Sequence, residues 1–138
     1  DPSEAVPFFK QAVAARDNSS PALNGLGAAL VSEGQFEPAT EFLKRAVQAD
    51  PDSVDAHFNL ASVLAQTGQF TDSAREFSWV VSHRPQDADA EAKLGTVLAE
   101  LKDYDTAETH FRHALVLDPH NQLAQESLKL LEQVRRQR

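Results

Sequence analysis

One block of residues recurs three times in this chain at a fixed interval of thirty-four residues. The copies read GQFEPATEFLKRAVQADP from Gly34, GQFTDSAREFSWVVSHRP from Gly68 and KDYDTAETHFRHALVLDP from Lys102. A period of this length is typical of repeat proteins, in which each copy is one supersecondary unit that stacks on its neighbours. The recurrence therefore predicts a repeat architecture.

The residues before each block predict a first helix with one apolar face. Leucines recur in two columns four residues apart, and a very small residue follows the first of them in each copy. The columns are Leu26, Leu60 and Leu94, then Leu30, Leu64 and Leu98, with Gly27, Ala61 and Gly95 between them. Apolar residues four apart lie on one helical face, and a small residue there lets a second backbone approach closely.

Each block itself predicts a turn and a second helix. Gly34 and Gly68 suit a left-handed turn, and Lys102 takes that place in the third copy. Small and large residues then alternate, which lets antiparallel helices interdigitate. These columns are Ala39, Ser73 and Ala107, then Leu43, Phe77 and Phe111, then Ala46, Val80 and Ala114.

Helix starts and stops follow the same period. Good N-cap residues recur at Ser19, Ser53, Asp87 and Asn121. We expect Glu37, Thr71 and Asp105 to cap the second helices, and prolines 51, 85 and 119 to mark where those helices end. The local signals agree with the global repeat.

This pattern resembles the tetratricopeptide repeat, in its small and large columns, its turn aromatics Phe36, Phe70 and Tyr104, and its prolines. The resemblance implies an all-α fold, an α-solenoid of antiparallel helix pairs that forms a right-handed superhelix of eight helices. It implies one domain over residues 1–138: the second helix of a truncated repeat at 1–19, full repeats at 20–53, 54–87 and 88–121, and a capping helix at 122–138.

The two ends of the chain are expected to differ. The helix expected at the N-terminus presents Val6, Phe9 and Val13 on a side that an earlier helix would cover. At the other end of the chain, polar Lys129 and Glu132 close the last helix. Because the chain has no methionine and starts inside a repeat, we expect it to be part of something longer. In the fragment itself, the apolar edge predicts a weak homodimer.

Composition narrows the classes of partner. Twenty-one Asp and Glu against thirteen Lys and Arg give a net charge of −8, which repels nucleic acid and anionic membrane surfaces. The chain has no cysteine, so it has neither a thiolate nucleophile nor a Cys-ligated zinc. Neither nucleic acid nor a membrane is an expected partner.

The sequence gives little sign of catalysis. His110 and His113 lie three apart on one helix, but we expect a solvated face with no third metal ligand beside them. His57 is expected to be partly buried and hydrogen-bonded. Acids such as Asp89 and Glu91 lie at helix starts, where they favour the helix dipole. We therefore expect no enzyme, no metal and no cofactor.

The resemblance implies that function lies on the concave groove lined by the first helices. The groove residues would be Asn24, Ala28, Asp55, Phe58, Asn59, Ser62, Gln66, Asp89, Lys93, Thr96 and Glu100. Asparagine and lysine can donate to the free carbonyls of an extended peptide, so we expect a peptide or helix of a partner protein to bind there. Because acids outnumber Lys93 on this face, the ligand should be neutral or basic.

Two further hypotheses concern particular residues. The carboxylate clamp that some members of the family use would need a cation where this chain has Asp89, so a clamp for acidic C-termini is not expected. Trp79 occupies a position that is normally polar and outward-facing; it is either a second contact surface or packed against a neighbouring helix.

Two other functions stay open at this stage. The chain could be the accessory region of a larger enzyme whose catalysis lies elsewhere, or a self-assembling scaffold. Flanking sequence would distinguish the first of these from a free-standing interaction module.

Overall fold

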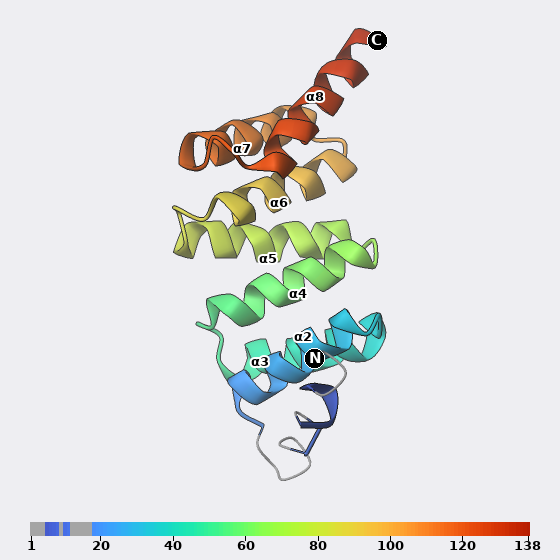
Figure 1. Cartoon of the computed structure of the whole chain (residues 1–138), viewed down its shortest axis with the longest axis vertical. Coiled ribbons are helices and arrows are strands. Elements are labelled where there is room, and N and C mark those ends of the chain that lie inside the picture. The colour runs from blue at the N-terminus through green and yellow to red at the C-terminus, as the bar shows by residue number, and fades with distance from the viewer. Residues whose placement is uncertain (1–4, 9, 12–17) are drawn as a thin grey trace. The chain divides into compact units, whose positions relative to one another are not determined.

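The computed structural model describes residues 5–8, 10, 11 and 18–138, and every regular element in that part is a helix. Residues 5–8, 10 and 11 are helical and precede seven further helices (Figure 1). These are α2 (Ser20–Ser32), α3 (Phe36–Ala49), α4 (Val54–Gln66), α5 (Phe70–His83), α6 (Ala88–Glu100), α7 (Tyr104–Leu117) and α8 (Gln122–Arg136). The expected all-α class and helix order are confirmed.

The chain divides into two compact units, Asp1–Gln69 and Phe70–Arg138. The first contains α2, α3 and α4, and the second contains α5 to α8. Within the first unit α2 packs on both α3 and α4, and within the second α6 packs on α5, α7 and α8. First helices of successive repeats therefore lie next to each other inside each unit, as a repeat architecture requires.

The core of the first unit is built from the predicted columns. Leu26, Leu43 and Ala39 are fully buried there. A Cβ atom on Gly27 would lie 2.5 Å from Cγ of Leu43, which is closer than real Cβ contacts come. The glycine column therefore does allow the second helix to pack closely against the first.

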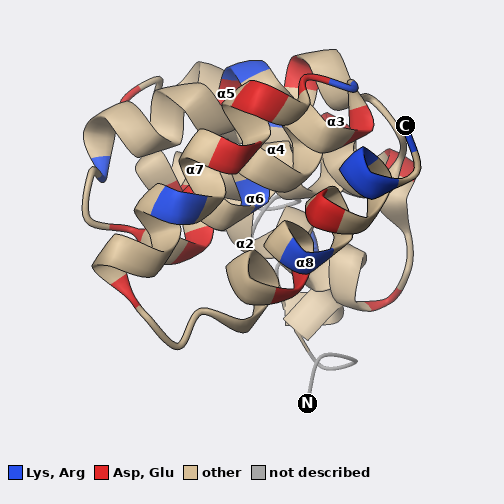
Figure 2. Ribbon diagram, turned by 90° about the horizontal axis from the view of Figure 1, so that it is seen from above, with Lys and Arg blue, Asp and Glu red and all other residues tan. Residues whose placement is uncertain are grey.

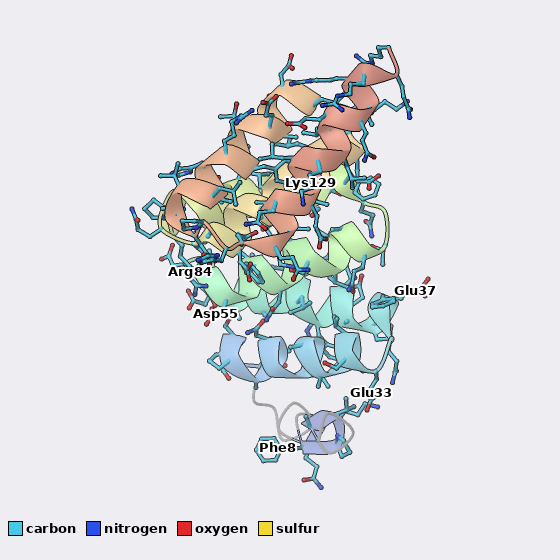
Figure 3. All side chains as sticks on the ribbon, turned by 45° about the horizontal axis from the view of Figure 1, so that its top comes forward. Phe8, Glu33, Glu37, Asp55, Arg84 and Lys129 are labelled. Atoms are coloured by element: carbon cyan, nitrogen blue, oxygen red, sulfur yellow. The ribbon has the colours of Figure 1, made fainter. Side chains whose placement is uncertain are left out.

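The N-terminal helix differs from its expectation in one respect. Val6 was predicted at an open apolar edge, but it is only 4% exposed and belongs to the core that contains Leu26 and Leu43. The neighbouring Phe8 is the exposed large residue, and its ring projects away from the helix (Figure 3). Phe9 and Val13, the other two edge residues, lie outside the described residues.

The second unit repeats this packing with a larger side chain. Phe111 is 1% exposed and packs with Ala107, Ala114 and the capping-helix residue Leu131. Helix α8 has the expected two sides in this unit, because Leu131 belongs to the core while Lys129 and Glu132 are exposed.

The turns between paired helices are left-handed at the predicted positions. Gly34 and Gly68 have φ values of 77° and 76°, and Lys102 has a φ of 65°. After each, a backbone N–H bonds back across the helix end, as from Asp103 to the carbonyl of Leu98 at 2.9 Å. One more residue then suffices to reverse the chain, since α3 starts at Phe36 and α7 at Tyr104.

That early start corrects the predicted caps of the second helices. Glu37 and Asp105 lie inside the first turn rather than before it. In α7 it is Asp103 whose side chain accepts the capping bond, from the N–H of Thr106 at 3.3 Å. The caps of the first helices are confirmed as predicted, at Ser19, Ser53, Asp87 and Asn121.

Candidate functional site

In the first unit the structure brings two of the predicted groove residues into direct contact. Nδ2 of Asn59 on α4 donates a hydrogen bond to Oδ1 of Asn24 on α2, at 2.9 Å. Both side chains are half-buried, so the pair keeps polar atoms at the surface. The bond crosses between neighbouring first helices, which places a paired amide at the centre of this face.

Small and polar side chains surround this amide pair. Ala28, Phe58 and Ser62 are half-buried, whereas Asp55 and Gln66 are exposed. The hydroxyl of Ser62 donates to the carbonyl of Phe58 at 2.9 Å, so its oxygen is left to act as an acceptor. The face combines one aromatic side chain with hydrogen-bonding groups.

In the second unit the remaining predicted residues lie along α6. Asp89 and Glu100 are exposed, while Lys93 and Thr96 are half-buried. Oδ1 of Asp89 accepts from Nδ2 of Asn121, the cap residue of α8, at 3.3 Å. That bond links the first helix of the last repeat to the capping helix.

The charges on these first helices are mostly negative. Asp55, Asp89 and Glu100 carry carboxylates at exposed positions, and Lys93 is the basic residue of the predicted set. Acidic segments occur on helices of both units (Figure 2). A field of this sign favours cations and disfavours anions in solution.

Trp79 packs within its own helix. Its ring stacks on the imidazole of His83, with centroids 3.7 Å apart and an interplanar angle of 18°. Nδ1 of His83 also lies 2.8 Å from the carbonyl oxygen of Trp79. This partner lies on the same helix and not on a neighbouring one, and the ring is half-buried, so both roles expected for Trp79 stay predictions.

The histidine pair on α7 is not a simple solvated face, which corrects the sequence expectation. Nδ1 of His110 lies 2.7 Å from Oε2 of Glu91, and Nδ1 of His113 lies 2.8 Å from Oε1 of the same carboxylate. Glu91 is 5% exposed and comes from α6. A third residue therefore does stand beside the pair: Glu91 on α6 is hydrogen-bonded to His110 and lies at ion-pair distance from His113, both on α7.

This cluster is not identified as a metal site. Within the described part of the chain, no group of three or more His, Cys, Asp or Glu residues is arranged to hold a metal ion. The third histidine considered, His57, is buried with its Nε2 2.8 Å from the carbonyl oxygen of Pro51, which confirms its expected structural role. None of the described helices is long and apolar enough to span a membrane.

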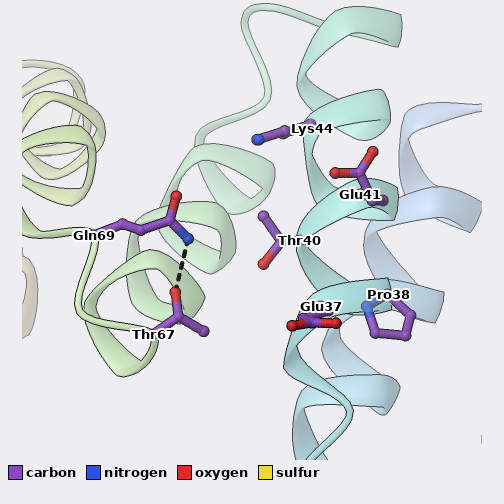
Figure 4. A pocket seen from close by; sticks show the side chains of 7 residues that line it. All are labelled: Glu37, Pro38, Thr40, Glu41, Lys44, Thr67 and Gln69. Carbon is purple, nitrogen blue, oxygen red and sulfur yellow. Dashed lines mark hydrogen bonds between the residues drawn. The ribbon is translucent and has the colours of Figure 1, made fainter.

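The first unit also contains a wide polar hollow that the sequence did not predict. It has a volume of about 710 Å³ and lies between the start of α3 and the end of α4 (Figure 4). Glu37, Glu41, Lys44 and Gln69 line it, and Nε2 of Gln69 donates to Oγ1 of Thr67 at 3.0 Å. It includes none of the predicted groove residues, and its charges are mixed.

A smaller hollow in the second unit is mostly apolar. Its volume is about 210 Å³, and it lies where α6, α7 and α8 meet. Thr96 and Glu100 of the predicted groove line it, together with Leu130 and Val134, which the sequence analysis missed. The spacing of four between Leu130 and Val134 was a signal for a second apolar stripe on α8.

Comparison with known proteins agrees with the repeat pattern. Models of the tetratricopeptide repeat match residues 1–54, 30–96 and 88–121. The chain has the fold of a tetratricopeptide repeat protein. The family resemblance is thus confirmed, and no curated protein matches the sequence.

Solved tetratricopeptide repeat structures are similar over most of the chain. MamA from Desulfovibrio magneticus RS-1 has a TM-score of 0.91 at 23% identity, over 99% of this chain and 76% of that one. YrrB, described as a TPR protein with an unusual peptide-binding site, has a TM-score of 0.86 at 26% identity, over 93% and 66%.

The first TPR of Spaghetti (RPAP3), bound to the HSP90 peptide SRMEEVD, has a TM-score of 0.79 at 20% identity, over 83% of this chain and 91% of that one. At this identity the likeness concerns the fold.

Proposed function

We propose that this chain is a non-catalytic protein-interaction module whose first helices bind a peptide or helix of a partner protein. The observation that carries the proposal is the hydrogen-bonded pair of Asn24 and Asn59. In this pair Nδ2 of Asn24 can still donate, and so can the second N–H of Asn59. Oδ1 of Asn59 can still accept. An extended peptide backbone offers both kinds of partner at short intervals.

The surroundings of the pair support a polypeptide ligand. Phe58, half-buried on the same helix, offers an aromatic surface, and aromatic residues are enriched among contacts that dominate binding energy. Ala28 and Ser62 are small, so they leave room for a backbone to approach. The hydroxyl of Ser62 donates to the carbonyl of Phe58 and not to a general base, so these residues do not form the nucleophile–base pair that a hydrolytic site needs.

Charge supports a neutral or basic ligand. Exposed Asp55 on α4, and exposed Asp89 and Glu100 on α6, would attract lysine and arginine and repel acidic segments. The acidic peptide SRMEEVD, which binds the RPAP3 repeat, is for this reason not the expected kind of ligand here. Such charges act mainly on association rate and specificity, and salt weakens them.

A peptide array tests the proposal. It would present neutral, basic and acidic peptides matched in length and apolar content, with SRMEEVD among the acidic ones. We expect binding to neutral and basic members, and a weaker signal from basic ones as salt is raised. An array in which acidic peptides dominate would contradict the charge preference, and one with no binding to any peptide would contradict the proposed function.

A further inference from the structure

The apolar hollow of the second unit has buried residues at its base and exposed residues at its mouth. Phe111 and Leu131, which are 1% and 6% exposed, belong to the core of this unit and also line the hollow. Leu130 and Val134 line it as well but are 61% and 37% exposed. The hollow thus lies between the buried core and two solvent-exposed apolar side chains.

The two exposed residues lie on one face of α8, because positions four apart are neighbours on a helix. Other exposed large apolar residues of this unit have no such surroundings: Val116 on α7 is 77% exposed and does not line the hollow. Single exposed apolar residues are ordinary, whereas apolar residues gathered around a concavity mark a contact site.

The walls restrict what could enter. Tyr104 forms part of one wall, and the guanidinium of Arg138 lies over its ring, 5.4 Å from the centroid. The volume of about 210 Å³ exceeds the roughly 150 Å³ of an apolar cavity that holds one benzene molecule. One phenylalanine or leucine side chain therefore fits, but a drug-sized ligand would exceed it.

The hollow shares two residues with the part of the predicted groove that lies in this unit. Thr96 and Glu100 on α6 belong to the predicted groove and also line the hollow. Glu100 is the charged residue among those lining it, so a lysine or arginine next to the inserted side chain would meet a carboxylate.

We propose that this hollow is an anchor pocket that takes one phenylalanine or leucine side chain of the bound peptide, with a basic residue beside it at Glu100. The inference rests on the proposed function, since the occupant is part of the same peptide. It adds a sequence requirement that the amide pair on α2 and α4 does not impose.

A probe that is not a peptide tests the pocket separately from the groove. The full chain, labelled with ¹⁵N, would be titrated with N-acetyl-phenylalaninamide and, as a matched probe, N-acetyl-alaninamide. We expect the first to shift the amide signals of Ala99, Leu130, Leu131 and Val134 together, and the second to leave them unchanged. No difference between the two probes would overturn the anchor pocket.

Two variants extend the test to peptides from the array. Leu130→Asp changes an exposed position at the mouth, and Val116→Asp is its control on another exposed position of the same unit. Binding of peptides with Phe or Leu should weaken about tenfold or more in Leu130→Asp and stay unchanged in Val116→Asp. Changing the peptide's Phe or Leu to alanine should have a similar effect.

The outcomes separate the two proposals. If array peptides bind but Leu130→Asp keeps full affinity, the anchor pocket is wrong and the proposed function stands. If no peptide binds while N-acetyl-phenylalaninamide still shifts the four amides, the proposed function is wrong, and the hollow accepts an aromatic side chain without anchoring a peptide. If these amides shift with protein concentration alone, a second copy of the chain occupies the site, which also overturns the peptide anchor.

Discussion

Cε1 of Phe111 lies 2.7 Å from the point where a Cβ atom on Gly95 would stand. The same point is 3.1 Å from the carbonyl oxygen of Ala107, so backbone as well as side chain blocks it. The distance explains why the column between the leucines holds glycine or alanine in each copy. In this unit α6 and α7 pack closely because position 95 has no side chain.

Gly95→Ala should therefore destabilise the chain by about 1–3 kcal/mol through overpacking. On an exposed helix the same change would stabilise by about 1 kcal/mol, so the expected sign is opposite to that of helix propensity. Urea unfolding measures the difference in the free energy of unfolding. The added cost should shrink when Phe111 is changed to alanine in both backgrounds, because alanine removes the ring atoms that a Cβ on residue 95 would meet; equal costs in the two backgrounds would contradict the contact.

Lys102 holds a left-handed backbone, with φ at 65°, where the first two copies have glycine. Lys102→Gly should stabilise the chain by about 1 kcal/mol, because glycine removes the clash between Cβ and backbone. Lys102→Ala is the control, since it removes the charge but keeps the Cβ atom. Thermal or urea unfolding should rank the glycine variant above the alanine variant, and equal stabilities would show that the backbone at 102 is unstrained.

Glu91 is a buried carboxylate that is hydrogen-bonded to His110 and lies at ion-pair distance from His113. Changing both histidines to alanine should cost about 1–3 kcal/mol, because it leaves a buried acceptor without these partners. The loss should exceed the sum of the two single changes, since one imidazole still satisfies part of the carboxylate. The exposed His120→Ala is the control in the same unfolding experiment, and a double variant as stable as that control would contradict the role assigned to Glu91.

Glu108 on α7 makes ion pairs with two arginines. The hydrogen bond from Arg112, with its Nη2 2.7 Å from Oε1 of Glu108, and then the one from Arg135 hold the pKa of this carboxyl below its usual value of 4.5. A lowered folded-state pKa means that the pair stabilises the fold above pH 4.5, and that this contribution is lost as pH falls through the folded pKa.

An NMR titration of the Glu108 carboxyl checks this directly. Arg112→Gln should raise the pKa of Glu108 toward its usual value, whereas Arg136→Gln, also a loss of one positive charge, should change it much less. Glu108 is half-buried but both of its arginine partners are exposed, so raising the salt should reduce the shift. A pKa that stays the same in Arg112→Gln would contradict the pairing.

The parts of the fold that repeat were predictable, and the parts that do not repeat were not. The glycine, leucine and cap columns recur in several copies. The same requirement for close packing or capping can therefore be recognised at more than one position. The contacts from Glu91 to His110 and His113 join residues that have no counterparts in the other copies, and only the packing of α6 on α7 reveals them. From their positions in the repeat alone, His110 and His113 were expected on a solvated face.

The sequence alone predicted which positions of the first helices are accessible to a ligand. All eleven groove residues are exposed or half-buried, and Asn24 and Asn59 meet. Leu130 could not be predicted from the repeat pattern, because it belongs neither to the inner face of α8 with Leu131 nor to the polar face with Lys129 and Glu132. Val6 was placed at an edge because its helix lacks a preceding partner in the sequence, yet it reaches the core; the weak dimer through Phe9 and Val13 stays a prediction.

The central claim is that the first helices bind a partner peptide through the Asn24–Asn59 pair and its aromatic neighbour. Fluorescence anisotropy with an array peptide would compare Asn59→Ala and Phe58→Ala with the exposed control Gln48→Ala on α3. We expect each of the first two variants to bind more weakly by about 1–3 kcal/mol, and Gln48→Ala to bind as the unchanged chain does. Equal affinities for all four proteins, each folded by circular dichroism, would contradict it.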